Sequence, residues 1–541
     1  MRQHPLTGRV AIVTGASSGI GRATAVALAR TGARLVLVGR DAQRLADTAA
    51  RMADATDGLA ESLALPLDVR SEADMAEMAQ RALDRFGAID ILVHAAGILR
   101  AQSQTLRTLA QLPAQEWDDV VDINLRGTFL ANRAVLPAML AARRGDILNL
   151  SSKSGHAGIA FDAPYCASKF GVMGLSQALA DEARPFGVRV QTLSPGKFDT
   201  EVLAQTGPLP QPGDIPPPER VADTIVWMLG MPEDTRLLSP VIEPLQRLGG
   251  SGWTGKPEAS TTTPRSARPA VATKEQTMST SFLGGAQDLR GKVVIVTGGT
   301  GGIGLATARA AASLGASVVV ADIDAARVDS VVTEIAAGGE AACIGVAIDV
   351  RREEDHARLV QATLDRFGRI DALISCAGIL RKRGTPPKVL VDVSTDEFDD
   401  VIGINLRGVF LANRAVLPTM ISQRSGMIIN LSSVQGLQGR AYDGPYCASK
   451  FGVIGLSQAV AEEVRSYGVK VQALMPAAVA TPMWEQNLPA PMPSDAVPPE
   501  RVADLIIFML LQPEDTILVG PVIAPLGARR RKAAAKPASA E

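Results

Sequence analysis

The second half of the chain repeats the first. The segment NLRGTFLANRAVLPAM, which begins at Asn124, returns as NLRGVFLANRAVLPTM at Asn405, and PYCASKFGVMGLSQALADE at Pro164 returns as PYCASKFGVIGLSQAVAEE at Pro445. The interval is far longer than the roughly 20–50 residues of a solenoid unit. Each copy is therefore expected to be a whole domain, made by duplication or fusion.

The repeat predicts four regions. The stretch between the copies includes GGSGWTGKPEASTTTPRSARP, a composition that cannot build a core and is typical of a flexible linker. The chain ends in ARRRKAAAKPASAE, for which we expect a solvated, disordered tail rather than a nucleic-acid contact. The expected regions are domain 1 (1–247), the linker (248–287), domain 2 (288–527) and the basic tail (528–541).

Composition narrows the classes of function. The chain has 55 basic and 56 acidic residues, so no global field favours nucleic acid or a membrane surface. Four cysteines indicate a reducing compartment, and the four scattered histidines argue against a histidine metal site or a Ser-His-Asp enzyme. The N-terminus carries no recognisable signal and no stretch has the length of a membrane span, so we expect a cytoplasmic protein.

Short β-branched apolar runs alternate with helical patterns in each copy. This alternation predicts a mainly parallel sheet with helices on both faces, a doubly wound, Rossmann-like α/β fold that binds ligands at the carboxyl ends of its strands. The first copy is expected to have strands at Val10–Thr14, Arg34–Val38, Ser62–Leu67, Ile89–His94, Asp146–Leu150 and Arg189–Leu193, and helices that include Gly21–Thr31, Ser71–Phe86, Glu116–Leu140 and Ala163–Arg184.

The first strand of each copy leads into a glycine turn and a helix. Glycine permits a tight turn and lets backbone amides approach a pyrophosphate at the start of a helix. The spacing is GxxxGxG rather than the GxGxxG fingerprint. Because the cluster follows a strand and opens a helix twice, it predicts two nucleotide sites, at Gly15, Gly19 and Gly21 and at Gly298, Gly302 and Gly304.

The end of the second strand is expected to meet the adenosine ribose. In the second copy Asp322 lies there, and a carboxylate accepts hydrogen bonds from the 2′-hydroxyl and repels a 2′-phosphate. In the first copy Gly39 and Arg40 take this place, and a guanidinium pairs with a 2′-phosphate. We therefore expect NADP in domain 1 and NAD in domain 2. The alternative for Arg40 is a solvated arginine that caps a loop.

A tyrosine and a lysine share one helix face in each copy. Tyr165 precedes Lys169 by four residues, and Tyr446 precedes Lys450 in the same way. A nearby ammonium stabilises a phenolate and lowers the pKa of the phenol, which makes the pair suited to proton transfer with an alcohol or carbonyl. Taken alone, such a pair is usually an ordinary surface pair.

Two further polar residues precede each tyrosine. Ser152 and Ser433 follow a strand, and their hydroxyls are suited to hydrogen-bond a substrate oxygen. Asn124 and Asn405 lie inside a helical segment, where asparagine is a mediocre former, and we expect them to bend the helix and hold a water against the lysine. A packing or capping role is the alternative for each asparagine.

On these residues both copies resemble short-chain dehydrogenases/reductases of the single-domain type. The motifs that carry the resemblance are TGASSGIG and TGGTGGIG, LDV at Asp68 and IDV at Asp349, AAG and CAG after the fourth strand, the Asn-Ser-Tyr-x-x-x-Lys set, and SPG with Thr200 in the first copy. The resemblance covers nearly all of the chain outside the linker and the tail.

The resemblance implies a role for each matched residue. Tyrosine would be the general acid/base, lysine would hold the nicotinamide ribose, serine would orient the carbonyl, and asparagine would support a relay water. The aspartates of LDV and IDV would contact the adenine, and Thr200 and Thr481 the carboxamide. The cofactor set it implies is Gly15, Ser17, Ser18, Gly19, Ile20, Gly21, Arg40, Asp68, Val69, Ala96, Gly97, Pro195, Gly196 and Thr200 in domain 1, and Gly298, Thr300, Gly302, Ile303, Gly304, Asp322, Asp349, Val350, Ala377, Gly378, Pro476 and Thr481 in domain 2.

The chain departs from the family pattern at a few places. His94 and Ser375 precede AAG and CAG where the family often has asparagine, and Ala477 replaces the usual glycine, which is expected to crowd the nicotinamide side or shift the lid. We interpret Cys166 and Cys447 as small helix residues rather than nucleophiles.

The expected substrate lids follow Thr200 and Thr481, and both are short and proline-rich. A small or medium, partly apolar substrate fits such lids. Basic residues follow the AAG and CAG motifs and either meet an anionic substrate, such as a carboxylate, a CoA thioester or an acyl carrier, or are solvated loop charges. These residues are Arg100 and Arg107 in the first copy and Arg381, Lys382, Arg383 and Lys388 in the second.

Several functions fit these features. The principal hypothesis is an NAD(P)-dependent oxidoreductase that interconverts a secondary alcohol and a ketone at two active sites. The alternatives are coupled oxidation and reduction that epimerises an alcohol, a 3-oxoacyl thioester reductase, and a non-enzymatic dinucleotide-binding redox sensor or scaffold. The helices near Asn124 and Ala163 are expected to pair the copies as an internal pseudo-dimer, and two chains to form a homodimer.

Overall fold

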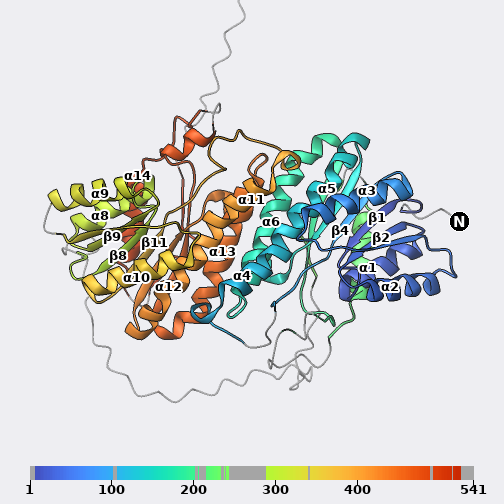
Figure 1. Cartoon of the computed structure of the whole chain (residues 1–541), viewed down its shortest axis with the longest axis horizontal. Coiled ribbons are helices and arrows are strands. Elements are labelled where there is room, and N and C mark those ends of the chain that lie inside the picture. The colour runs from blue at the N-terminus through green and yellow to red at the C-terminus, as the bar shows by residue number, and fades with distance from the viewer. Residues whose placement is uncertain are drawn as a thin grey trace, which may run out of the picture.

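The computed structural model describes most of both copies. The described residues are 6–101, 106–201, 205, 215–232, 235, 237, 239–242, 288–338, 341–487, 491–513 and 516–524. The expected linker and tail lie outside these residues. Where the copies are described, each forms one layer of parallel strands between two layers of helices (Figure 1).

Two seven-stranded parallel sheets are present in the described residues, with the orders β3-β2-β1-β4-β5-β6-β7 and β10-β9-β8-β11-β12-β13-β14. The order in which strands are added to the sheet reverses between β1 and β4, and between β8 and β11. This switch places a crevice at the carboxyl ends of these strands. The strands are β1 (Val10–Thr14), β2 (Arg34–Gly39), β3 (Ser62–Pro66), β4 (Ile91–His94), β5 (Gly145–Leu150), β6 (Val188–Pro195) and β7 (Val241–Ile242), then β8 (Val293–Thr297), β9 (Ser317–Asp322), β10 (Cys343–Ala347), β11 (Ala372–Ser375), β12 (Gly426–Leu431), β13 (Val469–Pro476) and β14 (Val522–Ile523).

The helices follow the same order in both copies. Those of the first copy are α1 (Gly19–Arg30), α2 (Ala42–Ala55), α3 (Glu72–Phe86), α4 (Ala114–Val121), α5 (Gly127–Ala142), α6 (Ala163–Ala183) and α7 (Glu219–Leu229). Those of the second are α8 (Gly302–Ser313), α9 (Ala325–Ala337), α10 (Glu353–Phe367), α11 (Thr395–Ile402), α12 (Gly408–Gln423), α13 (Gly444–Val464) and α14 (Pro499–Leu510).

The predicted doubly wound fold is confirmed, with one refinement. The helix expected over Glu116–Leu140 is α4 and α5 joined by a π-helical segment, Asp122–Arg126. The second copy has the same segment at Gly403–Arg407. An extra residue in such a turn breaks the regular hydrogen-bond ladder, and π-turns are frequent at functional sites.

The two copies pack against each other through their central helices. Helices α6 and α13 lie side by side where the halves meet (Figure 1). Trp117 of α4 stacks on Phe410 of α12, with ring centroids 4.3 Å apart, and Phe129 of α5 stacks on Phe398 of α11 at 4.2 Å. Because all four rings are buried, one apolar core joins the halves.

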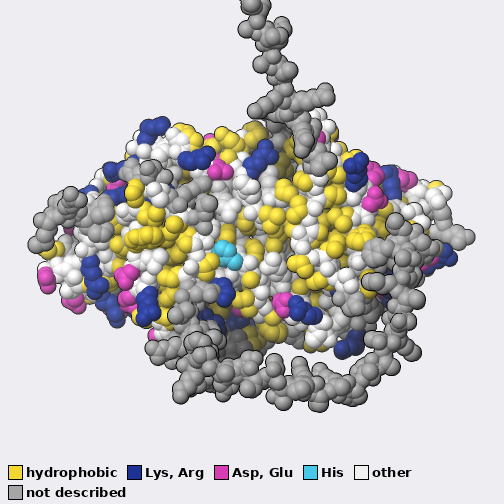
Figure 2. Space-filling view, turned by 180° about the vertical axis from the view of Figure 1, so that it is seen from behind, with side chains coloured by type: hydrophobic (Ala, Val, Ile, Leu, Met, Phe, Trp, Pro, Cys, Tyr) yellow, Lys and Arg dark blue, Asp and Glu magenta, His cyan; other side chains and the backbone are white. Residues whose placement is uncertain are grey.

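The surface carries charges of both signs. On the face shown in Figure 2, lysine and arginine side chains are interspersed with aspartate and glutamate, and apolar side chains gather between them. That face therefore presents no extended field of one sign. None of the described helices combines the length with the apolar character that a membrane-spanning segment needs.

Candidate active site

Two glycines in each glycine turn lie so close to neighbouring backbone atoms that a side chain at either position would clash. Gly15 has a φ of +67°, and a Cβ atom there would lie 2.8 Å from the backbone nitrogen of Ala96. A Cβ at Gly21 would lie 2.2 Å from the carbonyl oxygen of Gly15. The second copy repeats both contacts at Gly298 and Gly304. The turn therefore closes tightly against the loop after β4 or β11 and directs the start of α1 or α8 at the crevice.

A cavity of about 930 Å³ begins at this turn in the second copy. Its wall contains the glycine turn, the end of β9, the CAG loop, the tyrosine and the lysine, and the segment after β13, so one continuous space reaches from the expected ribose site to the expected chemical site. Among its lining residues are Gly298, Thr300, Gly302, Ile303, Gly304, Asp322, Asp349, Val350, Ala377, Gly378, Ser433, Tyr446, Lys450, Pro476 and Thr481. The residues present thus fit an extended dinucleotide. Residues 206–214 of the first copy, which match residues 487–495 in the sequence, lie outside the described residues.

The tyrosine, lysine and serine meet at the inner end of this crevice. The Lys169 Nζ atom lies 5.7 Å from the centre of the Tyr165 ring, and Lys450 lies 5.6 Å from the Tyr446 ring. Burial raises the pKa of Tyr165 to about 12, while its hydrogen bond with Ser152 acts in the opposite direction. The pKa of Tyr446 is raised for the same reason.

This result corrects one expectation. The sequence predicted that the lysine would lower the pKa of the phenol, but in the structure the loss of hydration at the tyrosine outweighs any help from the ammonium. The lysine is itself desolvated, which lowers the pKa of Lys169 and of Lys450 to about 8. Each ammonium donates a hydrogen bond to a strand-end carbonyl, Leu150 O at 3.0 Å or Leu431 O at 2.8 Å.

The asparagine lies in the π-helical segment of each copy. Asn124 is fully buried, and its side-chain amide donates to Ile98 O at 2.8 Å while its Oδ1 accepts from Ile98 N at 2.8 Å. Asn405 makes the same pair of bonds with Ile379. These bonds fasten the loop after β4 or β11, so the asparagine side chain braces that loop beside the lysine.

The two copies differ at the end of the second strand. In the second copy, Asp322 Oδ2 accepts from Thr300 Oγ1 at 2.6 Å and Oδ1 accepts from Ile323 N at 2.8 Å, so the carboxylate is held in place. In the first copy, Gly39 leaves this position open. Arg40 is exposed and makes no hydrogen bond or ion pair with a described residue, but it lies near enough to Asp68 to help lower the pKa of that carboxyl.

The other expected cofactor residues lie around the same crevice. Burial alone would raise the pKa of Asp68, yet hydrogen bonds from Arg70 keep that pKa below its usual range. The pKa of Asp349 is also lowered, chiefly by its side-chain hydrogen bond with Arg351. A Cβ atom at Gly19 would lie 3.2 Å from Thr200, and one at Gly302 would lie 3.0 Å from Thr481. The threonines therefore face the glycine turns across the crevice.

The departures from the family pattern are accommodated. Ala477 N donates to Ile523 O at 2.8 Å, as Gly196 N does to Ile242 O, so alanine leaves the β13–β14 pairing unchanged. His94 is buried and bonds Thr14 Oγ1 at 3.0 Å, and burial lowers the pKa of its ring to about 3. Burial raises the pKa of Cys166 and Cys447 to about 12, which agrees with a packing role.

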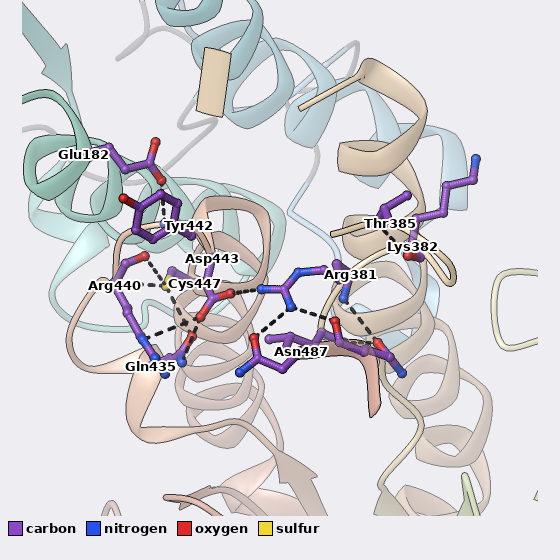
Figure 3. A network of polar contacts seen from close by, with 12 residues as sticks. Glu182, Arg381, Lys382, Thr385, Gln435, Arg440, Tyr442, Asp443, Cys447 and Asn487 are labelled. Atoms are coloured by element: carbon purple, nitrogen blue, oxygen red, sulfur yellow. Dashed lines mark hydrogen bonds and ion pairs between the residues drawn. The ribbon is translucent and has the colours of Figure 1, made fainter. Parts of the chain in front are cut away.

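Most of the basic side chains in the loops after β4 and β11 form hydrogen bonds or ion pairs with other residues of the protein. Arg381 is buried, and its guanidinium donates to Gln486 O at 2.8 Å, to Asn487 Oδ1 at 2.9 Å and to Asp443 Oδ1 at 2.6 Å (Figure 3). Arg100 joins Gln205 and Asp162 in the same way in the first copy. These two arginines are therefore neither solvated nor free for a substrate, since each ties the segment after the last long strand to the start of the tyrosine helix.

The remaining basic loop residues divide into two groups. Lys382 pairs with Asp400 at 3.2 Å, Lys388 pairs with Glu397 at 2.7 Å, and Arg107 pairs with Glu116. Arg383, in contrast, lines the cavity of the second copy and makes no hydrogen bond or ion pair with a described residue. Of the cations named from the sequence, Arg383 is thus the one available to a ligand in the described part of the second copy.

Replacing Arg381 by methionine is expected to loosen the wall of the cavity. The substitution leaves the Asp443 carboxylate, whose side chain is 6% exposed, without its main partner. Breaking a buried pair in this way costs about 3–5 kcal/mol. We expect a lower melting temperature of the full chain and faster amide exchange over residues 482–487. Lys382→Met, at a more exposed pair, is the control, with an expected cost of about 1 kcal/mol or less. If both substitutions change the melting temperature and the amide exchange equally, Arg381 does not hold the cavity wall.

Comparison with known proteins decides the family. The model of the short chain dehydrogenase family matches residues 9–209 and 292–491, which together make up most of the chain. The chain belongs to the short-chain dehydrogenase family. It is an oxidoreductase with two tandem domains of this family, whose members bind NAD(P).

Two curated relatives align with both domains. The chain is 27% identical over 542 residues to the peroxisomal hydratase-dehydrogenase-epimerase of Neurospora crassa, covering 93% of this chain and 57% of that protein. It is 29% identical over 520 residues to the protein of the same name from Saccharomyces cerevisiae, covering 86% of this chain and 54% of that protein. The chain thus spans about half the length of these relatives.

A third relative is the size of one domain. It is the 3-oxoacyl-[acyl-carrier-protein] reductase of Synechocystis sp., which is 40% identical over 240 residues and is covered over 94% of its own length and 43% of this chain.

Sequence reasoning missed several residues that shape the site. Three of them recur at matched positions in both copies: the glutamine that accepts from the backbone after β4 or β11, the aspartate that pairs with Arg100 or Arg381, and a glutamate near the end of the tyrosine helix. Identity at equivalent positions of two diverged copies was the available signal. The missed pairs are Gln205 and Gln486, Asp162 and Asp443, and Glu182 and Glu463. Arg100 and Arg381 were named from the sequence, but as candidates for a substrate rather than as partners of these aspartates.

Proposed function

We propose that the chain interconverts a secondary alcohol and a ketone with NAD(P) at two active sites, one in each domain. The observation that carries the proposal is that tyrosine, lysine, serine and asparagine converge twice beside a glycine-turn crevice, and that in the second domain one cavity joins the serine, tyrosine and lysine to the expected ribose site. The experiment is a panel of ketones offered to the full chain with NADH and with NADPH. Oxidation of neither cofactor with any ketone or thioester would count against the proposal.

Each group of the site has a distinct task in this reaction. The bound dinucleotide supplies or accepts the hydride. Tyr446 donates a proton to the carbonyl oxygen during reduction and removes it during oxidation, and Ser433 hydrogen-bonds the same oxygen. Because burial keeps the pKa of the phenol high, the tyrosine is protonated before reduction begins. Lys450, close to the tyrosine ring, stabilises the negative charge that develops on the phenol oxygen.

The pH dependence follows from the lysines. Burial lowers the pKa of Lys169 and Lys450 to about 8, so the ligand-free enzyme loses this ammonium as the pH rises through that value. We expect kcat/KM for ketone reduction to fall about tenfold per pH unit above this point, because the phenolate loses its cationic neighbour. A profile that stays flat up to about pH 10, the ordinary range of lysine, would contradict this role. Melting temperatures over the same range check that the chain stays folded.

The second candidate function is reduction of a 3-oxoacyl thioester. The names of the relatives include a hydratase-dehydrogenase-epimerase and a 3-oxoacyl-[acyl-carrier-protein] reductase. The observation that favours it here is charge at the cavity of the second domain. Arg383 and Arg440 both line that cavity, and Arg440 is 3.9 Å from its nearest acidic partner, Asp443. The matched positions in the first domain are Gln102 and Ile159. An anionic carrier group therefore suits the second domain better than the first.

The cofactor split extends the proposal. We infer that the first domain prefers NADP, through Arg40, and the second prefers NAD, through Asp322. Oxidation at one site and reduction at the other would then epimerise one alcohol. An alcohol that undergoes no inversion when both cofactors are present would exclude this combined reaction, while leaving two separate reductases.

Assembly and location complete the proposal. The contacts between α6 and α13 support an internal pseudo-dimer, and two chains would form a homodimer. A cytoplasmic location agrees with the four cysteines, all of which are free.

A further inference from the structure

A loop precedes the tyrosine helix in each domain, and both loops lie on the other half of the chain. We call residues 156–162 and 437–443 the tyrosine loops. In the first loop, Gly158 N donates to Gln458 Oε1 at 3.0 Å and Phe161 N donates to Glu463 Oε1 at 2.9 Å. Both acceptors belong to α13 of the second domain.

The second tyrosine loop has the reciprocal contacts. Gly439 N donates to Gln177 Oε1 at 2.9 Å and Tyr442 N donates to Glu182 Oε1 at 2.7 Å, and both acceptors belong to α6. Figure 3 shows Glu182 beside Tyr442, next to the network of Arg381 and Asp443. The approach is close, because a Cβ atom at Gly439 would lie 2.5 Å from that of Gln177.

The second oxygen of each glutamate holds another segment of the opposite domain. Glu463 Oε2 accepts from Leu109 N at 2.7 Å, and Glu182 Oε2 accepts from Leu390 N at 2.6 Å. Each carboxylate is less than a tenth exposed, so these backbone amides are its solvent-shielded partners. A buried carboxylate with both oxygens used in this way fixes the relative position of the two segments it joins.

The conformation that these bonds hold is an unfavourable one. Phe161 has a φ of +67° and Tyr442 a φ of +69°, in the left-handed region that costs a residue with a side chain roughly 1–2 kcal/mol. The catalytic tyrosine lies four residues further on in each domain. Between them lies Asp162 or Asp443, the partner of the arginine that holds the cavity wall. A shift of the loop would therefore move both the tyrosine helix and that wall.

We propose that Glu463 is a positioning residue for the Tyr165 site and Glu182 for the Tyr446 site, so that each active site is completed by the other half of the chain. The inference rests on the proposed function only in that both sites are active. Its distinctive consequence is a crossed effect, since damage to a glutamate of one domain lowers activity in the opposite domain.

The test uses full-length chains in which only one of the two sites is catalytically active, so that the measured activity comes from that site. Tyr446→Phe leaves only the first site active, and Tyr165→Phe leaves only the second. Adding Glu463→Ala is expected to lower kcat of the first site at least about tenfold, with a smaller change in KM, because the tyrosine is misplaced while the cofactor crevice remains. In the chain with only the second site active, the same substitution is expected to leave kcat within about twofold. Glu182→Ala is expected to give the reverse pattern.

Two further variants separate positioning from general damage. Glu462→Ala, at the exposed neighbour of Glu463, is the matched control and is expected to change neither site. Glu463→Gln keeps one acceptor for the two amides, so its loss of kcat is expected to lie between those of the wild type and Glu463→Ala. Equal losses at both sites, or a loss confined to the domain that carries the substitution, would overturn the proposal.

Amide exchange tests the positioning without any substrate. Glu463→Ala is expected to speed exchange at Leu109 and across residues 158–161 while leaving Leu390 and residues 439–442 unchanged. Unchanged exchange at all of these amides would overturn the proposal. If no ketone or thioester is turned over by any chain, the proposed function fails, and this exchange pattern still decides whether the glutamates hold the opposite loops.

Discussion

Phenylalanine in place of Tyr446 is expected to lower ketone reduction at the second site by about 10²–10⁴-fold, the range that general acid catalysis contributes. The ring is buried against Lys450, so phenylalanine keeps the packing and removes only the hydroxyl that donates the proton. Tyr165→Phe is expected to do the same at the first site. The measurement is the steady-state rate of NADH or NADPH oxidation with each ketone that the full chain accepts.

Cofactor binding provides the control for this prediction. Each phenylalanine variant is expected to bind NADH and NADPH as tightly as the wild type, because the removed hydroxyl serves the substrate oxygen. If both single variants and the double variant keep full activity, the phenol is not the proton donor. If one single variant alone removes all activity, the other domain is silent with that substrate.

The second large effect is a change of cofactor. Asp322→Gly with Ile323→Arg gives the second domain the residues that the first has at Gly39 and Arg40. The change removes the acceptor for a ribose hydroxyl, worth about 1.5–3 kcal/mol for a charged group, and adds a partner for a 2′-phosphate. At about 1.4 kcal/mol per factor of ten, the ratio of kcat/KM for NADPH over NADH is expected to rise at least about a hundredfold.

The reciprocal change tests the same reasoning in the first domain. Gly39→Asp with Arg40→Ile, made in the chain with only the first site active, is expected to shift that ratio toward NADH. A Cβ atom at Gly39 would lie 3.3 Å from Ser17 Oγ, so Ser17 must give way slightly and can then bond the new carboxylate as Thr300 bonds Asp322. If the ratio of kcat/KM for NADPH over NADH is unchanged in both double variants, these positions do not determine the cofactor preference.

Much of the fold could be predicted because it depends on local patterns. The run Val10–Thr14 is β-branched and apolar, and the structure has β1 over the same residues. The recurrence of tyrosine, lysine, serine and asparagine in two copies indicated where the chemical site lies. Helix α2 is not among the helices named from the sequence, although Asp41 caps its first turn by accepting from Arg44 N, a signal that can be read from the sequence.

What could not be predicted depends on contacts between distant segments. The pKa of Tyr165 rises because neighbouring elements bury the phenol, and spacing within one helix does not contain that information. Arg381 is followed by other basic residues and has the sequence pattern of a solvated loop, but it is buried against Asp443 and the segment after β13. The bond from Leu109 N to Glu463 joins the two domains and requires their relative placement.

We propose that one chain holds two complete dinucleotide sites of different preference. Equilibrium titration of the full chain with NADPH and with NADH, separately and together, measures this most directly. We expect two bound dinucleotides per chain at saturation. Replacing Arg40 by alanine is expected to abolish NADPH binding at one site, and replacing Asp322 is expected to weaken NADH binding at the other. A single bound dinucleotide per chain, unaffected by either substitution, would contradict it.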